Sequence, residues 1–470
     1  MRKLFFLTIV FTFTFSINSR AVSPADSINV APFGKVYVYK HTDTPQNLVI
    51  LISGDGGWKY GVTDFAEAFS EMNNLVIGVD ILRYYKDLRQ RKEECYNVSA
   101  DFVELTTFFE KKYNFTGYIP PVIMGYSSGA TLVYGILAQS RPGTFIGGIS
   151  IGFCPDIELP KMLCQINGLH EKNDTTGKRY FLLPDARLGN PWIVLHGKLD
   201  KVCSYSDVAD FVSKTANAEL ITLPDVGHGF SNWSDFMPRW KDAFNRLVDK
   251  YEKGLAANSN SDKPENIPLV ITKARVQNEE APVALIISGD GGWYGFEQSI
   301  ADSLANQGIP TVGLDSKKYF WNRTSPEKTA DDMASALNYY GKEWGRGRYL
   351  LIGYSLGAEI VPFIVTRLSR EMQSRISSAV LLSPEPETDF EIHISNMLGI
   401  GNANNSYKVM DEIIKMQPVP TLIIIGEDEK SQVPELLAGT TVKIRKIPGG
   451  HHFNRDTALI LKLMKDNQAF

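Results

Sequence analysis

Two pentads of one pattern decide the fold of this chain: Gly125-Tyr126-Ser127-Ser128-Gly129 and Gly353-Tyr354-Ser355-Leu356-Gly357. Each follows an apolar run that is typical of a buried strand, Val122–Met124 or Leu350–Ile352, and each precedes a helical pattern. A tight turn from strand to helix accepts only small flanking residues, and it lifts the serine hydroxyl above the sheet. The pentads therefore predict two nucleophile elbows, at Ser127 and Ser355.

The pentads belong to a longer internal repeat. The hexapeptide Ser53-Gly54-Asp55-Gly56-Gly57-Trp58 returns as Ser288-Gly289-Asp290-Gly291-Gly292-Trp293, in each case ahead of the pentad. A glycine-histidine turn follows each pentad, at Gly227-His228 and at Gly450-His451. Three matched features in the same order indicate a duplicated domain.

Short apolar runs alternate with amphipathic helical patterns in each half, which fits parallel strands covered on both faces. The expected strands are Leu48–Ser53, Leu75–Asp80, Val122–Tyr126, Ile146–Phe153 and Trp192–Gly197, then Val283–Ser288, Thr311–Asp315, Tyr349–Tyr354, Ser378–Ser383 and Thr421–Gly426. We therefore predict an α/β fold with two tandem α/β-hydrolase domains, whose parallel-sheet cores carry helices on both faces. The expected division is a first domain over 25–252, a polar linker over 253–268 and a second domain over 269–470.

The first residues read as an export signal. Met1-Arg2-Lys3 is basic, Leu4–Ile17 is apolar and too short to span a membrane, and Ser19-Arg20-Ala21 offers a cleavage site for signal peptidase. We expect a signal peptide over 1–21 and a periplasmic mature protein, with an uncleaved anchor as the alternative. The net charge of -4 gives no reason to expect a nucleic-acid partner.

All four cysteines lie in the first half of the chain, at Cys95, Cys154, Cys164 and Cys203. In an exported protein an even number of cysteines predicts disulfides, here with three possible connectivities. We favour a bond between Cys154 and Cys164, which are close in sequence. The alternative is four buried thiols.

A serine hydroxyl attacks poorly without a base, and the base needs an orienting acid. In this fold the three residues follow the order serine, acid, histidine. In the first half Asp200 follows a predicted strand and His228 follows the next one, so we predict the triad Ser127, Asp200 and His228. His196 lies at the end of a strand and is expected to be structural.

The second half offers two candidates for each remaining role. Aligning Phe453 with Phe230 places His451 opposite His228, with His452 as the alternative base. Aligning Gly426 with Gly197 places Glu429 opposite Asp200 and leaves Asp428 one residue short. We therefore favour Ser355, Glu429 and His451.

The repeated hexapeptide follows the strand from which this fold draws one oxyanion-hole amide, and the second amide comes from the residue after the nucleophile. The expected donors are the amides of Asp55 or Gly56 with Ser128, and of Asp290 or Gly291 with Leu356. The alternative is a tight turn with an aspartate-capped loop. No metal or nucleotide-binding motif occurs in the sequence, so we predict no cofactor.

The second half also resembles a known family. The segments that carry the resemblance are Leu314–Trp321, Arg323-Thr324, Pro326–Ala330, Leu351–Glu359, Pro362-Phe363 and Gly449–Phe453. They resemble the VirJ family of bacterial virulence proteins, and the two-domain layout resembles its longer, AcvB-like members. The first half looks like a diverged copy, with Asp80–Tyr85 in place of the Tyr-Phe-Trp segment.

The resemblance implies a periplasmic serine hydrolase, and for AcvB-like members hydrolysis of the aminoacyl ester of lysyl-phosphatidylglycerol. It places the nucleophile on Ser355 and the base on the Gly-Gly-His-His turn. Two positions differ from the pattern that the family leads us to expect: Glu359 stands where an aspartate is expected, and the acid segment reads Glu-Asp-Glu.

The leading interpretation is an exported serine ester hydrolase acting on an aminoacylated phospholipid or a small ester, at the outer face of the inner membrane and without spanning it. Asp290 or Glu359 is expected to select a cationic headgroup, and Tyr319 and Trp321 to meet the membrane surface. These rings alternatively pack over the core of the second domain. The competing interpretations are a non-catalytic binding or chaperone module of the envelope that supports secretion or virulence, and a peptidase or carbohydrate esterase.

Overall fold

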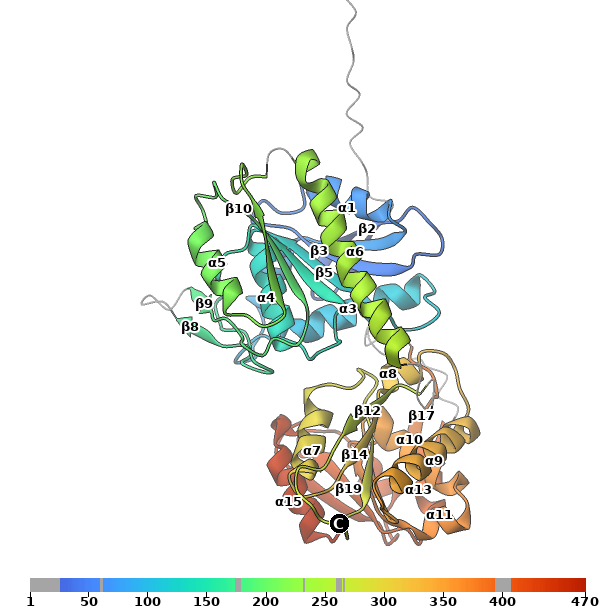
Figure 1. The fold of residues 1–470 in the computed structure, drawn as a ribbon. Helices are drawn as coiled ribbons and strands as arrows, with labels where there is room; N and C mark the ends of the chain where they lie inside the picture. Colours follow the sequence, from blue (N-terminus) through green and yellow to red (C-terminus); the bar gives the residue numbers. More distant parts are fainter. Residues whose placement is uncertain are drawn as a thin grey trace, which may run out of the picture.

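The computed structural model describes residues 26–59, 62–173, 179–230, 233–258, 264, 267–393 and 407–470. Its two large sheets are each built from one half of the chain, and each is covered by helices on both faces (Figure 1). Two small sheets, of three and of two strands, accompany them. The predicted α/β class and the tandem α/β-hydrolase architecture are confirmed. The expected signal peptide over 1–21 lies outside the described residues.

The first domain is built on an eight-stranded sheet with the order β1-β2-β4-β3-β5-β6-β10-β11. Its strands are β1 (Asp26–Val30), β2 (Gly34–Tyr39), β3 (Asn47–Ile52), β4 (Asn74–Val79), β5 (Val122–Tyr126), β6 (Gly147–Ile151), β10 (Trp192–Gly197) and β11 (Ala218–Leu223). The pairs from β4 to β11 are parallel, whereas β1 and β2 extend the sheet by antiparallel pairing. The five expected central strands are all present, and these two edge strands were not foreseen.

Alternate residues of β3 face two separate cores. Leu48, Ile50 and Ile52 pack with α2 (Ile81–Leu88), α3 (Val98–Lys112), α4 (Ser128–Gln139) and α5 (Tyr205–Ser213). Val49 and Leu51 pack on the opposite face with α1 (Val62–Ser70) and α6 (Trp233–Asn258). This arrangement explains the continuous apolar runs in the sequence, because both faces of the strands are buried.

The second domain repeats this plan with a seven-stranded sheet, in the order β12-β14-β13-β15-β16-β19-β20. Its strands are β12 (Leu269–Thr272), β13 (Val283–Ile287), β14 (Thr311–Leu314), β15 (Tyr349–Tyr354), β16 (Ile376–Leu382), β19 (Thr421–Gly426) and β20 (Lys443–Ile447). One face is covered by α9 (Pro326–Glu343), α10 (Leu356–Arg367), α13 (Val409–Lys415) and α14 (Val433–Leu436), and the other by α7 (Gly295–Ala305) and α15 (Thr457–Asp466). This domain also contains the short helices α8 (Ser316–Tyr319) and α11 (Arg370–Ser374) and the 3-10 helix η1 (Phe453–Arg455).

The expected linker over 253–268 begins too early. Helix α6 continues to Asn258, so the first six residues of that range are helical. In Figure 1 this helix runs along the first domain toward the second. Much of the remaining expected linker lies outside the described residues.

Two disulfides join the four cysteines, and neither is the expected bond between Cys154 and Cys164. Cys95 pairs with Cys164, and Cys154 pairs with Cys203, with Cα–Cα separations of 4.9 and 5.5 Å. The excursion between β6 and β10, which includes β7 (Asp156–Ile157), β8 (Glu171–Asn173) and β9 (Tyr180–Leu182), carries Cys164 back to the start of α3. Proximity in sequence was therefore a poor guide to proximity in space.

The tryptophan of each repeated hexapeptide covers a glycine of the neighbouring strand. A methyl carbon at Gly78 in β4 would lie 2.2 Å from the Trp58 ring, and one at Gly313 in β14 would lie 2.2 Å from the Trp293 ring. The hexapeptide therefore has a packing function that is the same in both domains. Within the described residues, no helix is long and apolar enough to cross a membrane.

Replacing Gly313 by alanine should lower the free energy of unfolding by about 1–3 kcal/mol, because the new methyl group overpacks the site against Trp293. Urea unfolding followed by tryptophan fluorescence would measure this loss. Gly347→Ala is the matched control in the same domain, since no atom lies within 4 Å of a methyl carbon there. Equal midpoints for the two variants would contradict the packing role.

Candidate active site

The backbone at the two predicted nucleophiles has nearly the same conformation. Ser127 has φ 54° and ψ -119°, and Ser355 has φ 51° and ψ -120°. Positive φ is uncommon for a residue other than glycine, and such strain persists where the surroundings enforce it. A methyl carbon at Gly125 or at Gly353 would lie 2.2 Å from the carbonyl oxygen at the start of the following helix. The flanking glycines of both pentads are therefore a steric requirement.

The structure brings Ser127, His228 and Asp200 together in one hydrogen-bonded chain. The Ser127 Oγ lies 2.9 Å from His228 Nε2, and His228 Nδ1 lies 2.8 Å from Asp200 Oδ2. The second carboxylate oxygen of Asp200 accepts the amides of Val202 at 2.9 Å and Cys203 at 3.0 Å. This geometry suits a nucleophile, its base and an orienting acid.

The environment of Asp200 favours its ionised form. Burial alone would raise its pKa, but the amides of Cys203 and Val202 and the His228 ring together lower it. A carboxylate that stays ionised can stabilise the imidazolium that forms when the base takes a proton. His196 is fully buried behind the site and pairs through Nε2 with the Cys203 carbonyl at 3.0 Å, which agrees with a structural role.

The second domain places Glu429, rather than Asp428, against His451. Glu429 Oε2 lies 3.2 Å from His451 Nδ1. Its other oxygen accepts the Ser383 hydroxyl at 2.6 Å and the Gly426 amide at 2.6 Å. The acid and the base are thus in contact, although no hydrogen bond joins Ser355 to His451 or to any other described side chain. Catalytic hydrogen bonds are often long without substrate.

His452 points away from this pair and contacts the Tyr354 hydroxyl through Nδ1. Partial desolvation of this ring lowers its pKa, and the neighbouring His451 and Arg455 lower it further. Tyr126, the counterpart of Tyr354, instead donates to the carbonyl of His228 at 2.9 Å. The two domains therefore hold the turn that bears the base in different ways.

The repeated hexapeptides form tight turns beside the two serines. The Gly57 amide donates to the Gly54 carbonyl at 2.9 Å, and the Gly292 amide to the Gly289 carbonyl at 3.0 Å. Asp55-Gly56 and Asp290-Gly291 occupy the centres of these turns. Ser128 and Leu356 are the first residues of α4 and α10, immediately after each nucleophile. The turn is compatible with the oxyanion donors proposed from the sequence, whose role stays a prediction.

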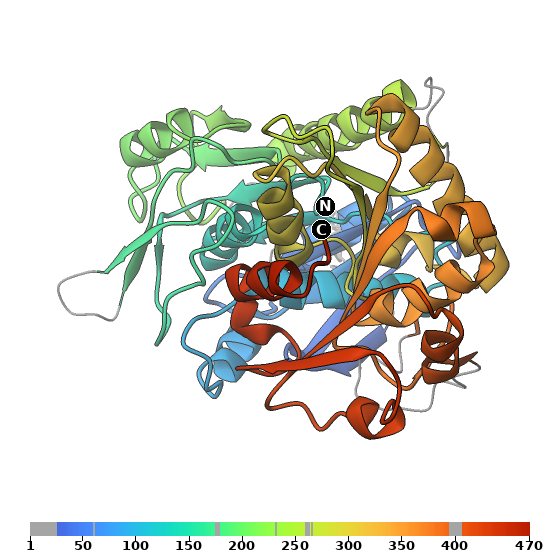
Figure 2. The ribbon, with the colours of Figure 1, turned by 90° about the horizontal axis from the view of Figure 1, so that it is seen from below.

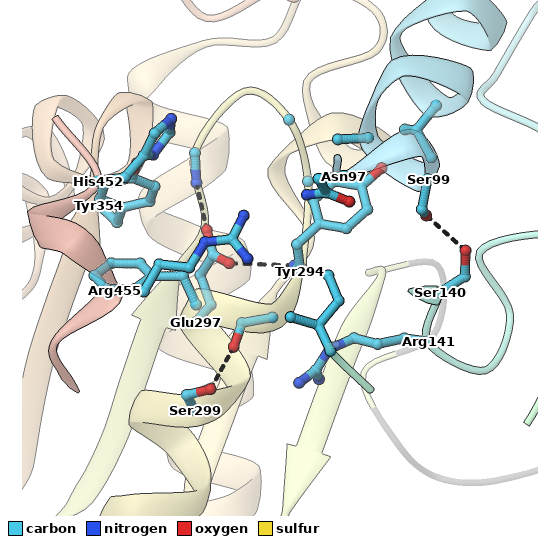
Figure 3. Close-up of a pocket in the computed structure, with 18 of the residues that line it drawn as sticks. Asn97, Ser99, Ser140, Arg141, Tyr294, Glu297, Ser299, Tyr354, His452 and Arg455 are labelled. Atoms are coloured by element: carbon cyan, nitrogen blue, oxygen red, sulfur yellow. Dashed lines mark hydrogen bonds between the residues drawn. The ribbon is translucent and has the colours of Figure 1, made fainter. Parts of the chain in front are cut away.

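A cavity of about 580 Å³ lies over Ser355, and both domains line it. From the second domain it includes Gly289, Asp290, Gly291, Tyr294, Glu297, Lys317, Tyr354, Ser355, His451, His452 and Arg455. From the first domain it includes residues at the start of α3 and the end of α4, among them Asn97, Ser99, Glu104 and Arg141. Figure 3 shows this wall of the first domain opposite His452 and Arg455. In Figure 2, the molecule is seen from the side of the second domain, and this domain lies in front of the first domain.

Tyr319 and Trp321 are not placed to meet a membrane or to line this cavity. Trp321 is 1% exposed and donates through Nε1 to the Phe115 carbonyl of the first domain at 2.9 Å. Tyr319 donates to Asp332 Oδ2 at 2.5 Å, and the intervening Phe320 is fully buried. The prediction of a membrane-facing aromatic segment is wrong, because these side chains pack in the second domain and against the first.

Glu359 is also poorly suited to select a cationic headgroup. It is 7% exposed and does not belong to the cavity wall. Burial raises its pKa to about 8, so the side chain is mostly neutral near pH 7. Asp290 is exposed and lines the cavity beside Ser355, and it remains the acidic candidate of the two.

Sequence reasoning missed the contribution of the first domain to this cavity. No function was predicted for Glu104 in α3 or for Arg141, which follows α4, and they reach the cavity because the two domains pack together. Ser383, which holds Glu429, was also missed. It ends a predicted strand, and its positive φ of 50° was invisible in the sequence.

The sheets, the elbows and the serine-acid-histidine arrangements define an α/β-hydrolase class. The chain belongs to the family described as "Bacterial virulence protein (VirJ)", whose profile matches residues 46–141 and 281–469, more than half of its length. The match omits the part of the first domain that carries Asp200 and His228.

Three solved structures with similar folds each match less than half of this chain. Est1E from Butyrivibrio proteoclasticus has a TM-score of 0.33 at 17% identity, covering 44% of this chain and 97% of its own. The esterase domain of a Rhodothermus marinus protein has a TM-score of 0.29 at 16% identity, and the match covers 43% of this chain and 86% of that one. Proline iminopeptidase from Mycobacterium smegmatis has a TM-score of 0.32 at 12% identity, and the match covers 43% of this chain and 94% of that one. No curated protein matched the sequence.

In a Ser127→Ala background, His451→Gln should lower kcat by about 10²–10⁴-fold, because a general base is lost. His452→Gln should lower it less than tenfold, since this ring contacts Tyr354 and not the acid. Steady-state hydrolysis of a chromogenic ester would measure both effects. Similar losses in the two variants would refute the assignment of His451.

The disulfide between Cys154 and Cys203 tethers the loop that orients Asp200, since the Cys203 amide donates to this carboxylate. Replacing both cysteines by serine should slow fluorophosphonate labelling of Ser127, by up to about a hundredfold if the acid shifts by an ångström. Labelling of Ser355 serves as the internal reference. The matched control replaces Cys95 and Cys164, which are not among the described hydrogen-bond partners of Asp200. If that control slows Ser127 as much, the proposed link between the loop and the triad fails.

Proposed function

We propose that this protein is an exported serine ester hydrolase that cleaves the aminoacyl ester of an aminoacylated phospholipid, with lysyl-phosphatidylglycerol as the expected substrate. The observation that carries the reaction class is the chain of hydrogen bonds from Ser127 through His228 to Asp200, at 2.9 and 2.8 Å. A non-catalytic binding or chaperone module would have no need of this geometry on a strained serine.

The proposed mechanism follows from these positions. The serine Oγ attacks the ester carbonyl while the histidine takes its proton, and the carboxylate stabilises the imidazolium. Amides from the hexapeptide turn and from the first residue of the following helix stabilise the oxyanion. The histidine then gives the proton to the leaving alcohol, and the acyl group stays on the serine. In the second half of the reaction the histidine takes a proton from water, which attacks the acyl-serine ester, and then returns that proton to the serine Oγ as the acid leaves.

We assign the lipid substrate to Ser355 in the second domain. The cavity of about 580 Å³ over this serine has the size of a small-molecule site. The family profile also covers this domain almost completely, over residues 281–469. Asp290 lines the cavity and supplies a carboxylate for a cationic aminoacyl group. Ser127 is proposed as a second, weaker site for small esters.

The location is part of the same proposal. The apolar segment at the start of the chain supports export, and a periplasmic enzyme would reach the ester from the surface of the membrane. The aromatic segment at 319–321 is not proposed as the contact with the membrane surface, because the side chains of Phe320 and Trp321 are buried.

Ser355→Ala should lower lysine release from vesicles containing lysyl-phosphatidylglycerol by at least about a thousandfold, because the nucleophile is removed. Ser127→Ala, the matched control, should retain most of the activity. Mass spectrometry of released lysine would measure both rates. The reverse ranking would show that the first domain is the lipid hydrolase.

The preference for lysyl-phosphatidylglycerol over a neutral ester of similar size should shrink as salt rises, because an exposed carboxylate such as Asp290 is screened. Asp290→Asn should reduce the same preference at low salt. Rapid hydrolysis of soluble esters without lysine release from vesicles would overturn the lipid substrate and leave the hydrolase proposal intact.

A further inference from the structure

The wall that the first domain contributes to the cavity carries a positive charge without a partner. Arg141 follows the end of α4 and lines the cavity over Ser355. Its Nε is buried and makes no hydrogen bond, and no described carboxylate lies close enough for an ion pair. The Arg141 side chain is half-buried, and its buried Nε lacks the hydrogen bond that a buried donor normally makes, which suggests that a ligand completes the site.

The nearest acidic groups do not satisfy Arg141. Burial lowers its pKa, while the more distant Asp302 and Glu297 oppose this effect. Arginine nevertheless stays protonated in proteins. The Glu297 carboxylate already accepts the amides of Gly289 at 3.4 Å and Tyr294 at 3.2 Å, and its burial raises its pKa. Both oxygens of Glu297 therefore already accept hydrogen bonds from backbone amides that precede α7.

Arg455 brings a second free guanidinium to the same cavity from the second domain. Among the described residues its guanidinium makes neither a hydrogen bond nor an ion pair, whereas its backbone amide donates to the His452 carbonyl at 2.7 Å. Figure 3 shows the side chains of Arg455 and Arg141 approaching the start of α7 from opposite sides, toward Glu297 and Ser299. Lys317 differs, because it is 2% exposed, donates to the Tyr294 hydroxyl at 3.3 Å and lies over the rings of Tyr118 and Tyr294.

Arg455 also lies on the turn that bears the base. It lies three residues after His452, and Phe453, Asn454 and Arg455 all have positive φ, from 49° to 59°. Three such residues in a row are held against their usual preference, which fits a segment whose geometry serves a site. A group bound between the two arginines would therefore lie next to the turn that positions His451.

We infer that Arg141 and Arg455 form an oxyanion subsite across the domain boundary, which binds the phosphodiester of the lipid while Ser355 attacks the aminoacyl ester. This inference rests on the proposed function of Ser355. A guanidinium offers paired donors that match the oxygens of phosphate or carboxylate. The phosphodiester is the oxyanion that an aminoacylated phospholipid carries near its ester, so we commit to it. The first domain then acts as a specificity element for the second.

Binding can be tested without catalysis on the full-length Ser355→Ala protein. Calorimetry would compare dihexanoyl-phosphatidylglycerol with its neutral methyl phosphotriester and with a dihexanoylglycerol that carries a succinyl carboxylate. We expect the phosphodiester to bind at least about tenfold more tightly than the triester, a difference of about 1.4 kcal/mol. Arg141→Gln should abolish this preference, and Arg141→Lys should restore part of it.

Two further variants guard against a loss of folding. Arg455 is exposed, so Arg455→Gln should weaken binding of the phosphodiester without changing the thermal midpoint. Arg370→Gln, an exposed arginine at the start of α11, should bind as the parent does. Equal binding of diester and triester, or a preference that survives both Arg141→Gln and Arg455→Gln, would overturn the subsite. Equal, arginine-dependent binding of the carboxylate would overturn the commitment to phosphate.

Kinetics on the otherwise unmodified protein separate this inference from the proposed function. Arg141→Gln should raise KM for short-chain lysyl-phosphatidylglycerol about tenfold or more, whereas the control Arg370→Gln should leave KM and kcat unchanged. Hydrolysis that does not depend on Ser355 would refute the proposed function itself. Hydrolysis that depends on Ser355 with an unchanged KM in Arg141→Gln would refute the subsite alone.

Discussion

A steric contact between two backbone segments underlies both candidate sites. The strand before each serine approaches the first turn of the helix after it so closely that a methyl carbon at Gly125 or Gly353 would overlap the carbonyl of Gly129 or Gly357. This approach forces the serine into positive φ and lifts its hydroxyl above the sheet. The histidine and the acid then need only to arrive from the ends of the later strands.

The two domains share one fold, but their candidate active sites differ. The first domain holds a fully hydrogen-bonded serine, histidine and aspartate, and a disulfide ties down the loop of the acid. The second domain has a glutamate held by Ser383, a serine without a hydrogen bond to its histidine, and the large cavity. One site thus has the better resting geometry, and the other has the better developed binding space.

The sequence was sufficient for features that depend on local pattern. Buried strands, both elbows and the order of serine, acid and histidine follow from apolar runs, small residues and spacing. Register with the first half also selected Glu429 and His451, the acid and base that the structure places in contact.

Features that depend on distant packing escaped the sequence. The bond of Cys95 to Cys164 closes a loop of 69 residues, and the burial of Trp321 depends on Phe115 in the other domain. The pKa of Glu359 is raised by burial, and the sequence of α10 alone does not predict that burial. The antiparallel strands β1 and β2 are partly exposed, so their apolar signal is weak.

The shared cavity also bears on how such a protein can evolve after duplication. A redundant copy is usually free to lose its function, but here the end of α4 in the first copy forms part of the wall around the serine of the second. Changes at that surface would be felt in the neighbouring domain even if the first active site were silent. Selection on the second site would therefore conserve parts of the first domain that have no role in its own chemistry, and the pair would be inherited as a single unit.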